Sequence, residues 1–211
     1  MPHAPEGEMS GKRLALLVLP VIFLVSSALS QVNEVSLTAG RTFVSTQTNQ
    51  ADGLPVHFGN EESIAANYGR LLKTHRIFGI YAELPVAIYF RMDVNTNIGT
   101  SPKDIGALFA TPSVRVNVFS GDSVTPWVSA GGGFGHFRVA PVTLYDNPNP
   151  GSGSNTGVIQ FGAGLDTWFW HSWGARFEAR DFYSGVPDLN IDTGRSRQHN
   201  YYVGVGVMHR F

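Results

Sequence analysis

The chain of 211 residues contains no cysteine, which excludes disulfides, thiolate nucleophiles, cysteine-ligated zinc and a lipid-anchored lipoprotein. Charged residues are also scarce, at 15% of the sequence, whereas about a quarter of the residues of a soluble protein are charged. The net charge of -1 provides no basic surface, so no nucleic-acid partner is expected. The histidines form no H-x-H or H-E-x-x-H set, and neither a metal nor another cofactor is predicted.

Glycine is abundant, but its spacing does not fit a nucleotide-binding loop. The run "PWVSAGGGFGHFRV" lacks the third glycine of the dinucleotide fingerprint, and no Lys-Ser or Lys-Thr pair completes a P-loop. The same G-x-G spacing occurs three times, at Gly131/Gly133, Gly162/Gly164 and Gly204/Gly206. Glycines at a period of two predict one face of several β-strands, because strand side chains alternate between faces.

An apolar segment near the N-terminus has the organisation of an export signal. Lys12 and Arg13 precede the run "LALLVLPVIFLVSSAL", which ends at small residues, with Ser30 just beyond it. We expect a signal peptide over residues 1–30, cleaved before Gln31, and a mature domain over 31–211. A membrane anchor is the alternative, but the run contains a proline and is shorter than about 18 residues.

The rest of the chain alternates apolar and other residues as β-strands do, with no sustained helical period. In "IFGIYAELPVAIYFR", every second residue from Phe78 to Phe90 is apolar. The opposite face holds Gly79, Tyr81, Glu83, Pro85, Ala87, Tyr89 and Arg91. Eight such segments are expected, at about 33–44, 62–72, 75–91, 105–119, 124–140, 156–170, 173–184 and 199–211.

The connections between these segments alternate between short and long. Short turns are expected near 72–75, at "SGDS" (120–123) and at "HSW" (171–173), and the other connections are long and polar. Short turns at one end and long loops at the other describe an outer-membrane barrel, with turns in the periplasm and loops outside. The predicted fold is all-β: an eight-stranded antiparallel up-and-down transmembrane β-barrel preceded by a cleavable signal peptide.

A soluble barrel of the lipocalin kind would show the same alternation. Its second face would meet water and carry dense charge, whereas here that face mixes glycine and aromatic residues with sparse charge. One example is the set Gln160, Gly162, Gly164, Asp166, Trp168 and Trp170. The other face is nearly free of charge, as lipid contact requires when a mid-membrane Arg or Lys costs about 2–4 kcal/mol. The pattern favours a bilayer outside and a crowded lumen inside, where glycines leave room for Trp127, Trp168 and Tyr202.

The signal peptide, the strand "TPWVSAGGGFGHF" and the closing "YYVGVGVMHRF" resemble the small outer-membrane β-barrels of the OmpA/OmpX type. Such "outer membrane protein beta-barrel domain" proteins occur in Gram-negative bacteria, and the resemblance covers essentially all of the mature chain. It implies location in the cell outer membrane. Gly206 and Phe211 match the family's C-terminal assembly signal, and His209 departs from it where a hydrophobic or aromatic residue is usual.

The same resemblance implies the partners of the protein. These are outer-membrane lipid and lipopolysaccharide, the barrel-assembly machinery during biogenesis, and a host or environmental surface that the long loops contact. The barrel is expected to be a monomer.

Six charged residues point into the predicted lumen. An isolated buried charge is costly, so these residues must pair with one another. We expect a salt-bridged plug that holds the barrel closed, formed by Glu83, Arg115, Asp166, Arg176, Glu178 and Arg180.

No catalytic residue is predicted. Some barrels of this kind modify lipid A with His, Ser and acidic residues near the outer rim. The matching candidates are His199, Ser196 and Asp192 in the last long loop, and His136 with Tyr145 and Asp146. The adjacent pair His171-Ser172 lies in a predicted periplasmic turn, on the wrong side for that chemistry. The favoured function is therefore a non-enzymatic outer-membrane protein with a structural, adhesive or envelope-protecting role. A narrow channel is the second interpretation and a lipid A enzyme the third.

Overall fold

The computed structural model describes residues 32–95, 104–119, 123–140, 142–144, 147–149, 153–189 and 192–211. The expected signal peptide lies outside these residues, as do Tyr145 and Asp146. All regular elements of the described part are β-strands. Among the same residues there is no helix of the length and apolarity that crossing a membrane requires.

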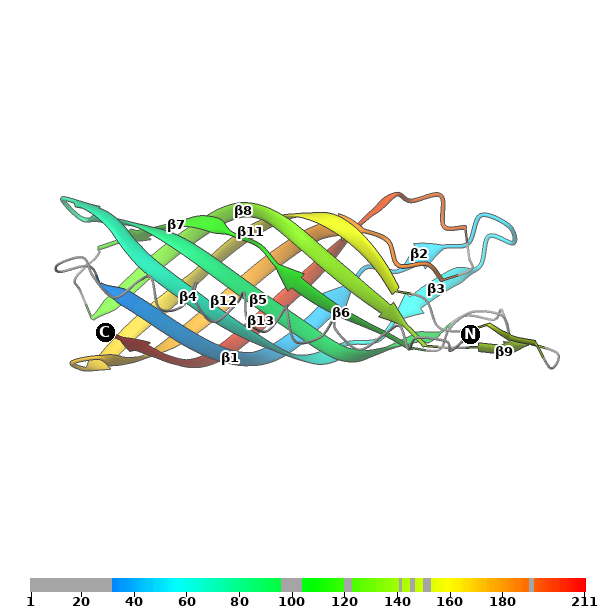
Figure 1. The fold of residues 1–211 in the computed structure, drawn as a ribbon, viewed down its shortest axis with the longest axis horizontal. Helices are drawn as coiled ribbons and strands as arrows, with labels where there is room; N and C mark the ends of the chain where they lie inside the picture. The colour runs from blue at the N-terminus through cyan, green and yellow to red at the C-terminus, as the bar shows by residue number, and fades with distance from the viewer. Residues whose placement is uncertain are drawn as a thin grey trace, which may run out of the picture. The chain divides into compact units, whose positions relative to one another are not determined.

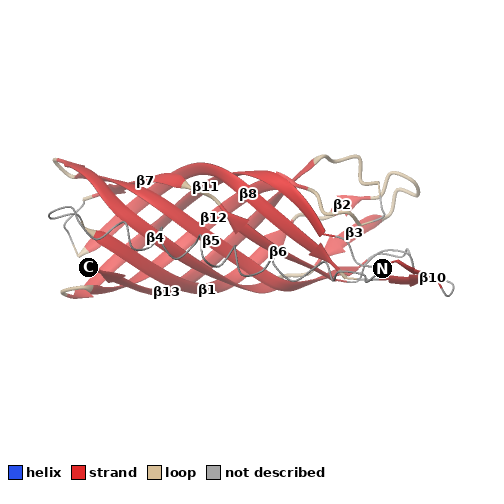
Figure 2. Cartoon of the chain, in the orientation of Figure 1, coloured by secondary structure: helices blue, strands red, loops and turns tan. Residues whose placement is uncertain are grey.

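The long strands form an antiparallel ring (Figures 1 and 2). In ring order they are β1 (Asn33–Val44), β4 (Glu61–His75), β5 (Phe78–Asn95), β6 (Asp104–Ala110) with β7 (Ser113–Val118), β8 (Val124–Val139), β11 (Gly153–Trp170), β12 (Trp173–Gly185) and β13 (Arg197–Arg210). Each strand pairs with the next one along the chain, and β13 pairs with β1, so the ring closes. The all-β, up-and-down architecture predicted from the alternating pattern is confirmed.

One expected strand is interrupted. The segment 105–119 was expected to be continuous, but it is divided into β6 and β7, which both pair with β5 on one side and with β8 on the other. The break falls at Thr111 and Pro112, because proline has no N–H group to donate to the ladder. Backbone hydrogen bonds persist across the break: Thr111 N–H donates to the Pro85 carbonyl at 3.1 Å, and Gly132 N–H donates to the Pro112 carbonyl at 3.2 Å.

Two connections expected to be irregular contain short hairpins. The first is built from β2 (Gln47–Thr48) and β3 (Pro55–Phe58), and the second from β9 (Val142–Leu144) and β10 (Asn147–Asn149). The turn expected near 72–75 is also displaced. It lies at Arg76 and Ile77, because β4 continues to His75, beyond its expected end at 72, and β5 begins only at Phe78.

Both ends of the ring-forming chain meet at one end of the barrel. Asn33 and Phe211 exchange two backbone hydrogen bonds of 2.9 Å, and the turn at His171 and Ser172 lies at this same end. We call it the C-terminal end. The β2–β3 hairpin follows β1 at the opposite end (Figure 1), which we call the hairpin end.

Side chains alternate between a buried inner face and an exposed outer face. On β13, Val203, Val205 and Val207 are exposed, whereas Tyr202 and Met208 are buried. Three residues expected on the inner face are instead exposed, namely Arg91, Gly133 and Trp170. Arg91 and Trp170 lie at register shifts, between Tyr89 and Met92 in β5 and between Trp168 and Trp170 in β11, which change the alternation locally. Gly133 lies beside the break between β6 and β7, against Ala110 and Thr111.

Three glycines show why the barrel needs this residue at some positions and not at others. A side chain at Gly164 would collide with the Trp127 ring, and one at Gly133 would collide with the backbone of the neighbouring strand at Ala110. A side chain at Gly132 would meet only the Val158 carbonyl oxygen, at an ordinary 3.5 Å. Glycine is therefore a packing requirement at Gly133 and Gly164 and not at Gly132.

The lumen has two chemically different halves. Along β12, which starts at the C-terminal end, buried Arg176, Glu178 and Arg180 precede buried Phe182. Along β5, which runs in the same direction, Glu83 precedes Tyr89. Charged side chains thus occupy the half nearer the C-terminal end. An apolar cluster, described below, occupies the half nearer the hairpin end.

Candidate functional site

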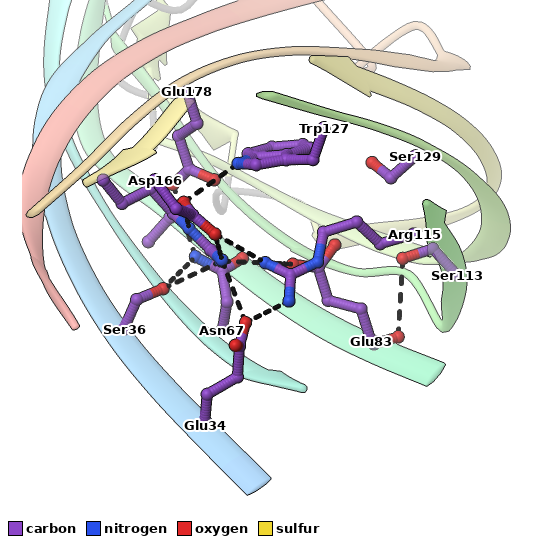
Figure 3. Close-up of polar contacts among 12 residues, drawn as sticks. Glu34, Ser36, Asn67, Glu83, Ser113, Arg115, Trp127, Ser129, Asp166 and Glu178 are labelled. Atoms are coloured by element: carbon purple, nitrogen blue, oxygen red, sulfur yellow. Dashed lines mark hydrogen bonds and ion pairs between the residues drawn. The ribbon is translucent and has the colours of Figure 1, made fainter. Parts of the chain in front are cut away.

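The six charged residues expected in the lumen are all buried there, together with a seventh, Glu34 of β1. Figure 3 labels Glu34, Glu83, Arg115, Asp166 and Glu178 of this set. Each is at most 4% exposed. They come from strands distributed around the ring: β1, β5, β7, β11 and β12. We call these seven residues the charge network. The alternation of each strand places them on its inner face, and closure of the ring brings them together.

Glu83 is the acidic centre of the charge network, because it contacts all three arginines. Its carboxylate oxygens lie 3.2 Å from both Arg176 and Arg180 and 3.6 Å from Arg115. Glu83 is on β5 and Arg180 is on β12, which stand on opposite sides of the ring. The route between them passes β4, β1 and β13 one way, and β6 with β7, β8 and β11 the other way. These ion pairs therefore cross the lumen.

Arg176 and Arg115 share two further carboxylates, those of Asp166 and Glu34. Arg176 donates from Nε and Nη2 to the two oxygens of Asp166, both at 2.8 Å, which is the bidentate geometry that strengthens such pairs. Its Nη2 also donates to Glu34 at 3.1 Å. Arg115 binds Glu34 directly and reaches Asp166 at 3.3 Å. Each carboxylate of this group thus contacts at least two guanidinium groups.

The charge network continues into neutral hydrogen bonds through Glu178. Arg180 Nε donates to Glu178 at 2.8 Å, and Glu178 also accepts hydrogen bonds from Thr38 of β1 and Asn67 of β4. The Thr38 hydroxyl in turn bonds the hydroxyl of Tyr202 on β13 at 2.8 Å. Through these partners the charge network is connected to β1, β4 and β13, none of which supplies a buried arginine.

Trp127 is the aromatic centre of the site. Its indole N–H donates to Asp166 at 3.0 Å, and its ring centroid lies 5.7, 5.2 and 5.0 Å from the guanidinium carbons of Arg115, Arg176 and Arg180. Cation–π contacts in a desolvated setting contribute about 2 kcal/mol. The expectation that inner-face glycines leave room for Trp127 agrees with the collision that a side chain at Gly164 would cause.

Sequence reasoning missed Glu34 and the central position of Trp127. The signal for Glu34 was present, because Glu34, Ser36 and Thr38 alternate with Val35 and Leu37 in the first expected strand. No comparable signal marks Trp127. Its contacts depend on which inner-face residues of the other strands lie at the same height along the barrel axis.

The charged groups of the site neutralise one another. The charge network contains four carboxylates and three guanidinium groups, and Arg210 adds a fourth cation at the C-terminal end, 3.8 Å from Glu34 and stacked on Trp168 at 3.9 Å. Within the described residues, no group of three or more His, Cys, Asp or Glu side chains is arranged to hold a metal ion.

Neither a model of a known protein family nor a curated protein matches the sequence. Solved structures do match the fold. The N-terminal barrel domain of Pseudomonas aeruginosa OprF aligns with a TM-score of 0.50 at 14% identity, covering 88% of this chain and 100% of that one. Ail, the attachment invasion locus protein of Yersinia pestis, aligns at 0.51 and 13%, covering 87% and 100%. Neisserial surface protein A aligns at 0.51 and 12%, covering 86% and 96%.

The fold is that of the small outer-membrane β-barrels. In this barrel the residues of the expected assembly signal lie at the seam between β13 and β1. A side chain at Gly206 would collide with the β1 backbone at Leu37, so glycine allows the close approach of the two strands. His209, the departure from the signal, packs its ring 4.6 Å from Trp173 and 6.1 Å from Phe211. The imidazole of His209 thus makes the ring contacts that an aromatic residue would make at this position.

Among the described candidates for lipid A chemistry, His199 does not contact Asp192 or Ser196. His199 lies within β13 rather than in a loop, and its Nδ1 contacts Asp181 at 2.7 Å instead of Asp192 or Ser196. Asp192 accepts a backbone hydrogen bond from Gly194 N–H at 2.7 Å. His136 contacts Asn155 at 2.8 Å, and its expected companions Tyr145 and Asp146 lie outside the described residues.

Proposed function

We propose that this protein is a non-enzymatic barrel of the cell outer membrane, whose lumen is closed by the charge network. Its role is structural, envelope-protecting or adhesive. With β6 and β7 taken as one strand interrupted at Pro112, the ring has eight transmembrane strands. An export signal over residues 1–30 delivers the chain, and the barrel functions as a monomer.

The outer face supports the bilayer location. Large apolar side chains such as Leu37, Phe90, Phe161 and Phe177 are exposed on it, on strands spread around the ring. Soluble monomers rarely expose apolar patches larger than several hundred Å². Lipid removes this cost, because the bilayer interior is as apolar as the side chains. The proposed partners of this face are outer-membrane lipid and lipopolysaccharide.

The observation that carries the closed lumen is the contact of Glu83 with arginines on the opposite wall. Side chains that cross the ring at 3.2 Å fill the space that an ion would need. An eight-stranded barrel is only just wide enough for its inner side chains, so such a network occupies the lumen.

The proposal also covers the assembly of the barrel and its orientation in the membrane. Gly206 and Phe211 form the signal that the barrel-assembly machinery reads during insertion. The C-terminal end faces the periplasm and the hairpin end faces outward. The long connections at the hairpin end then contact a host or environmental surface.

Three measurements test the proposal. Refolded barrel in planar bilayers should give no stepwise conductance, and unboiled protein should migrate differently from boiled protein on SDS gels. Conductance steps in the wild type would show a narrow channel instead. Identical migration of the two forms, together with recovery in the soluble fraction, would contradict the membrane barrel. Altered lipid A masses in a deletion strain would indicate an enzyme.

A further inference from the structure

The hairpin half of the lumen is packed by aromatic side chains. Phe109 lies at the centre: its ring stacks on Phe182 at 5.0 Å and meets Phe137 edge-on at 5.8 Å, and Tyr89 lies 6.2 Å away. All four side chains are at most 2% exposed. We call these four residues the aromatic plug. Its members come from β5, β6, β8 and β12, so the plug, like the charge network, spans the ring.

The β2–β3 hairpin adds a side chain to the same cluster. Val56 of β3 is fully buried and belongs to the apolar core that contains the aromatic plug, and Phe58 packs against this core. β3 also pairs with the last residues of β5, through His57 with Asn95 and Phe58 with Val94. The hairpin therefore folds onto the core at the end of the barrel instead of projecting away from it.

Polar contacts hold the hairpin in this position. Gln47 of β2 donates to Gln198 at 3.0 Å, and Gln198 donates to Asn200 at the same distance. Asn200 is anchored in turn on the Phe182 carbonyl and the Ser184 hydroxyl, both at 2.9 Å. These side chains are buried, and the hairpin is joined to the barrel through them and through the short β3–β5 ladder, while β2 and β3 are not among the strands that close the ring.

We propose that the lumen is closed by two separate seals: the charge network at the C-terminal end, and the aromatic plug covered by the β2–β3 hairpin as a detachable lid. The inference rests on the proposed function as a closed barrel and adds to it. Each seal blocks ions by a different mechanism. The charge network fills the lumen with paired side chains, whereas an apolar constriction excludes water and therefore hydrated ions. Opening one seal leaves the other intact. The hairpin half of the lumen can therefore become accessible to solvent without the passage of ions through the whole barrel.

Thiol labelling tests this arrangement, because the natural chain contains no cysteine. Ser36→Cys reports on the charge network, since the Ser36 hydroxyl contacts Arg176 at 3.2 Å. Ala107→Cys reports on the apolar half, where Ala107 belongs to the buried core. The full-length barrel is reconstituted in liposomes and exposed to a charged, membrane-impermeant methanethiosulfonate reagent. With no further change, both cysteines should react slowly.

Each seal is then opened alone. Val56→Asp places a charge under the lid and should raise the reaction rate of Ala107→Cys about tenfold or more, because labelling follows the open population, while Ser36→Cys stays slow. Arg176→Ala removes the arginine that contacts Ser36, Glu83 and Asp166. It should accelerate the labelling of Ser36→Cys and leave that of Ala107→Cys slow. The matched control is Leu54→Asp, which places the same charge at an exposed position of the same hairpin and should change neither rate.

The outcomes separate the two proposals. If either opening accelerates both cysteines, or if Val56→Asp leaves Ala107→Cys slow, the two-seal arrangement is wrong. If both cysteines react quickly in the otherwise unchanged barrel, the closed lumen itself is wrong. Should Val56→Asp fail to give the heat-modifiable form, Gln47→Ala loosens the same lid more gently. It should then accelerate Ala107→Cys alone, and an unchanged rate would overturn the lid.

Discussion

Strands β5 and β12 each pass through both halves of the lumen, and the kind of packing they provide changes along their length. Near the C-terminal end, Glu83 and Arg180 meet across the ring with their charges paired. A few residues further along the same strands, Tyr89 and Phe182 join a cluster of buried apolar side chains. The first region depends on which group faces which, because an unpaired buried charge is costly. The second depends mainly on volume, because apolar cores tolerate exchanges that conserve it.

The largest effect should follow a change that alters charge and not size. Glu83→Gln leaves three arginines short of one shared carboxylate and should lower the free energy of unfolding by about 3–5 kcal/mol. Glu62→Gln, at an exposed position of β4, is the matched control and should cost less than about 1 kcal/mol. Urea unfolding of the refolded barrels measures both. Equal unfolding midpoints for Glu83→Gln and Glu62→Gln would show that charge pairing in the lumen does not contribute to stability as proposed.

In the apolar region, a loss of side-chain volume should lower stability more than an exchange of one apolar group for another of similar volume. Phe109→Ala removes the ring at the centre of the aromatic plug and should cost about 3–5 kcal/mol. Phe109→Met keeps most of the volume and should cost less than about 1.5 kcal/mol. The same unfolding experiment gives both values. A methionine variant as unstable as the alanine variant would indicate that the ring contacts themselves are required.

A smaller effect should separate neighbouring glycines of β8, the strand that pairs with the interrupted β6 and β7. Gly133→Leu forces a side chain against the backbone at Ala110 and should cost about 1–3 kcal/mol or prevent closure. At Gly132 a side chain would make only an ordinary 3.5 Å contact with the Val158 carbonyl oxygen, so Gly132→Leu should fold with an unchanged yield. Folding yield on unboiled SDS gels is the readout. Equal damage at both positions would mean that the inner and outer faces of β8 are misassigned.

The smallest effect should have opposite signs in the two regions. The Tyr89 hydroxyl is buried in the apolar half without a hydrogen-bond partner among the described residues, so Tyr89→Phe should raise stability by about 1 kcal/mol. The Tyr202 hydroxyl bonds Thr38 in the charged half, so Tyr202→Phe should lower stability by a similar amount of about 1 kcal/mol. Changes of the same sign in urea unfolding would contradict this contrast.

The sequence predicted the charged half better than the apolar half. Alternation along single strands was sufficient to place Glu83, Arg115 and Asp166 on inner faces, because a period of two is a local property. It could not show that Trp127 contacts all three arginines, since those contacts depend on the relative register of strands that are distant in sequence. It also missed the β2–β3 hairpin, because its buried residues, Gln47 and Val56 among them, lie in a polar connection without an apolar alternation. Bulges displaced Arg91 and Trp170 for the same reason: an extra residue leaves no mark in the apolar pattern.

The central claim is that charged side chains from opposite walls hold the lumen closed, and a double-mutant cycle on Glu83 and Arg180 tests it most directly. Glu83→Gln, Arg180→Met and the combined variant are unfolded in urea beside the wild-type barrel. A direct contact across the lumen predicts a coupling free energy of about 1–3 kcal/mol, with the combined variant less unstable than the two single losses together. A coupling close to zero would show that the two residues act separately and would contradict the closed, cross-linked lumen.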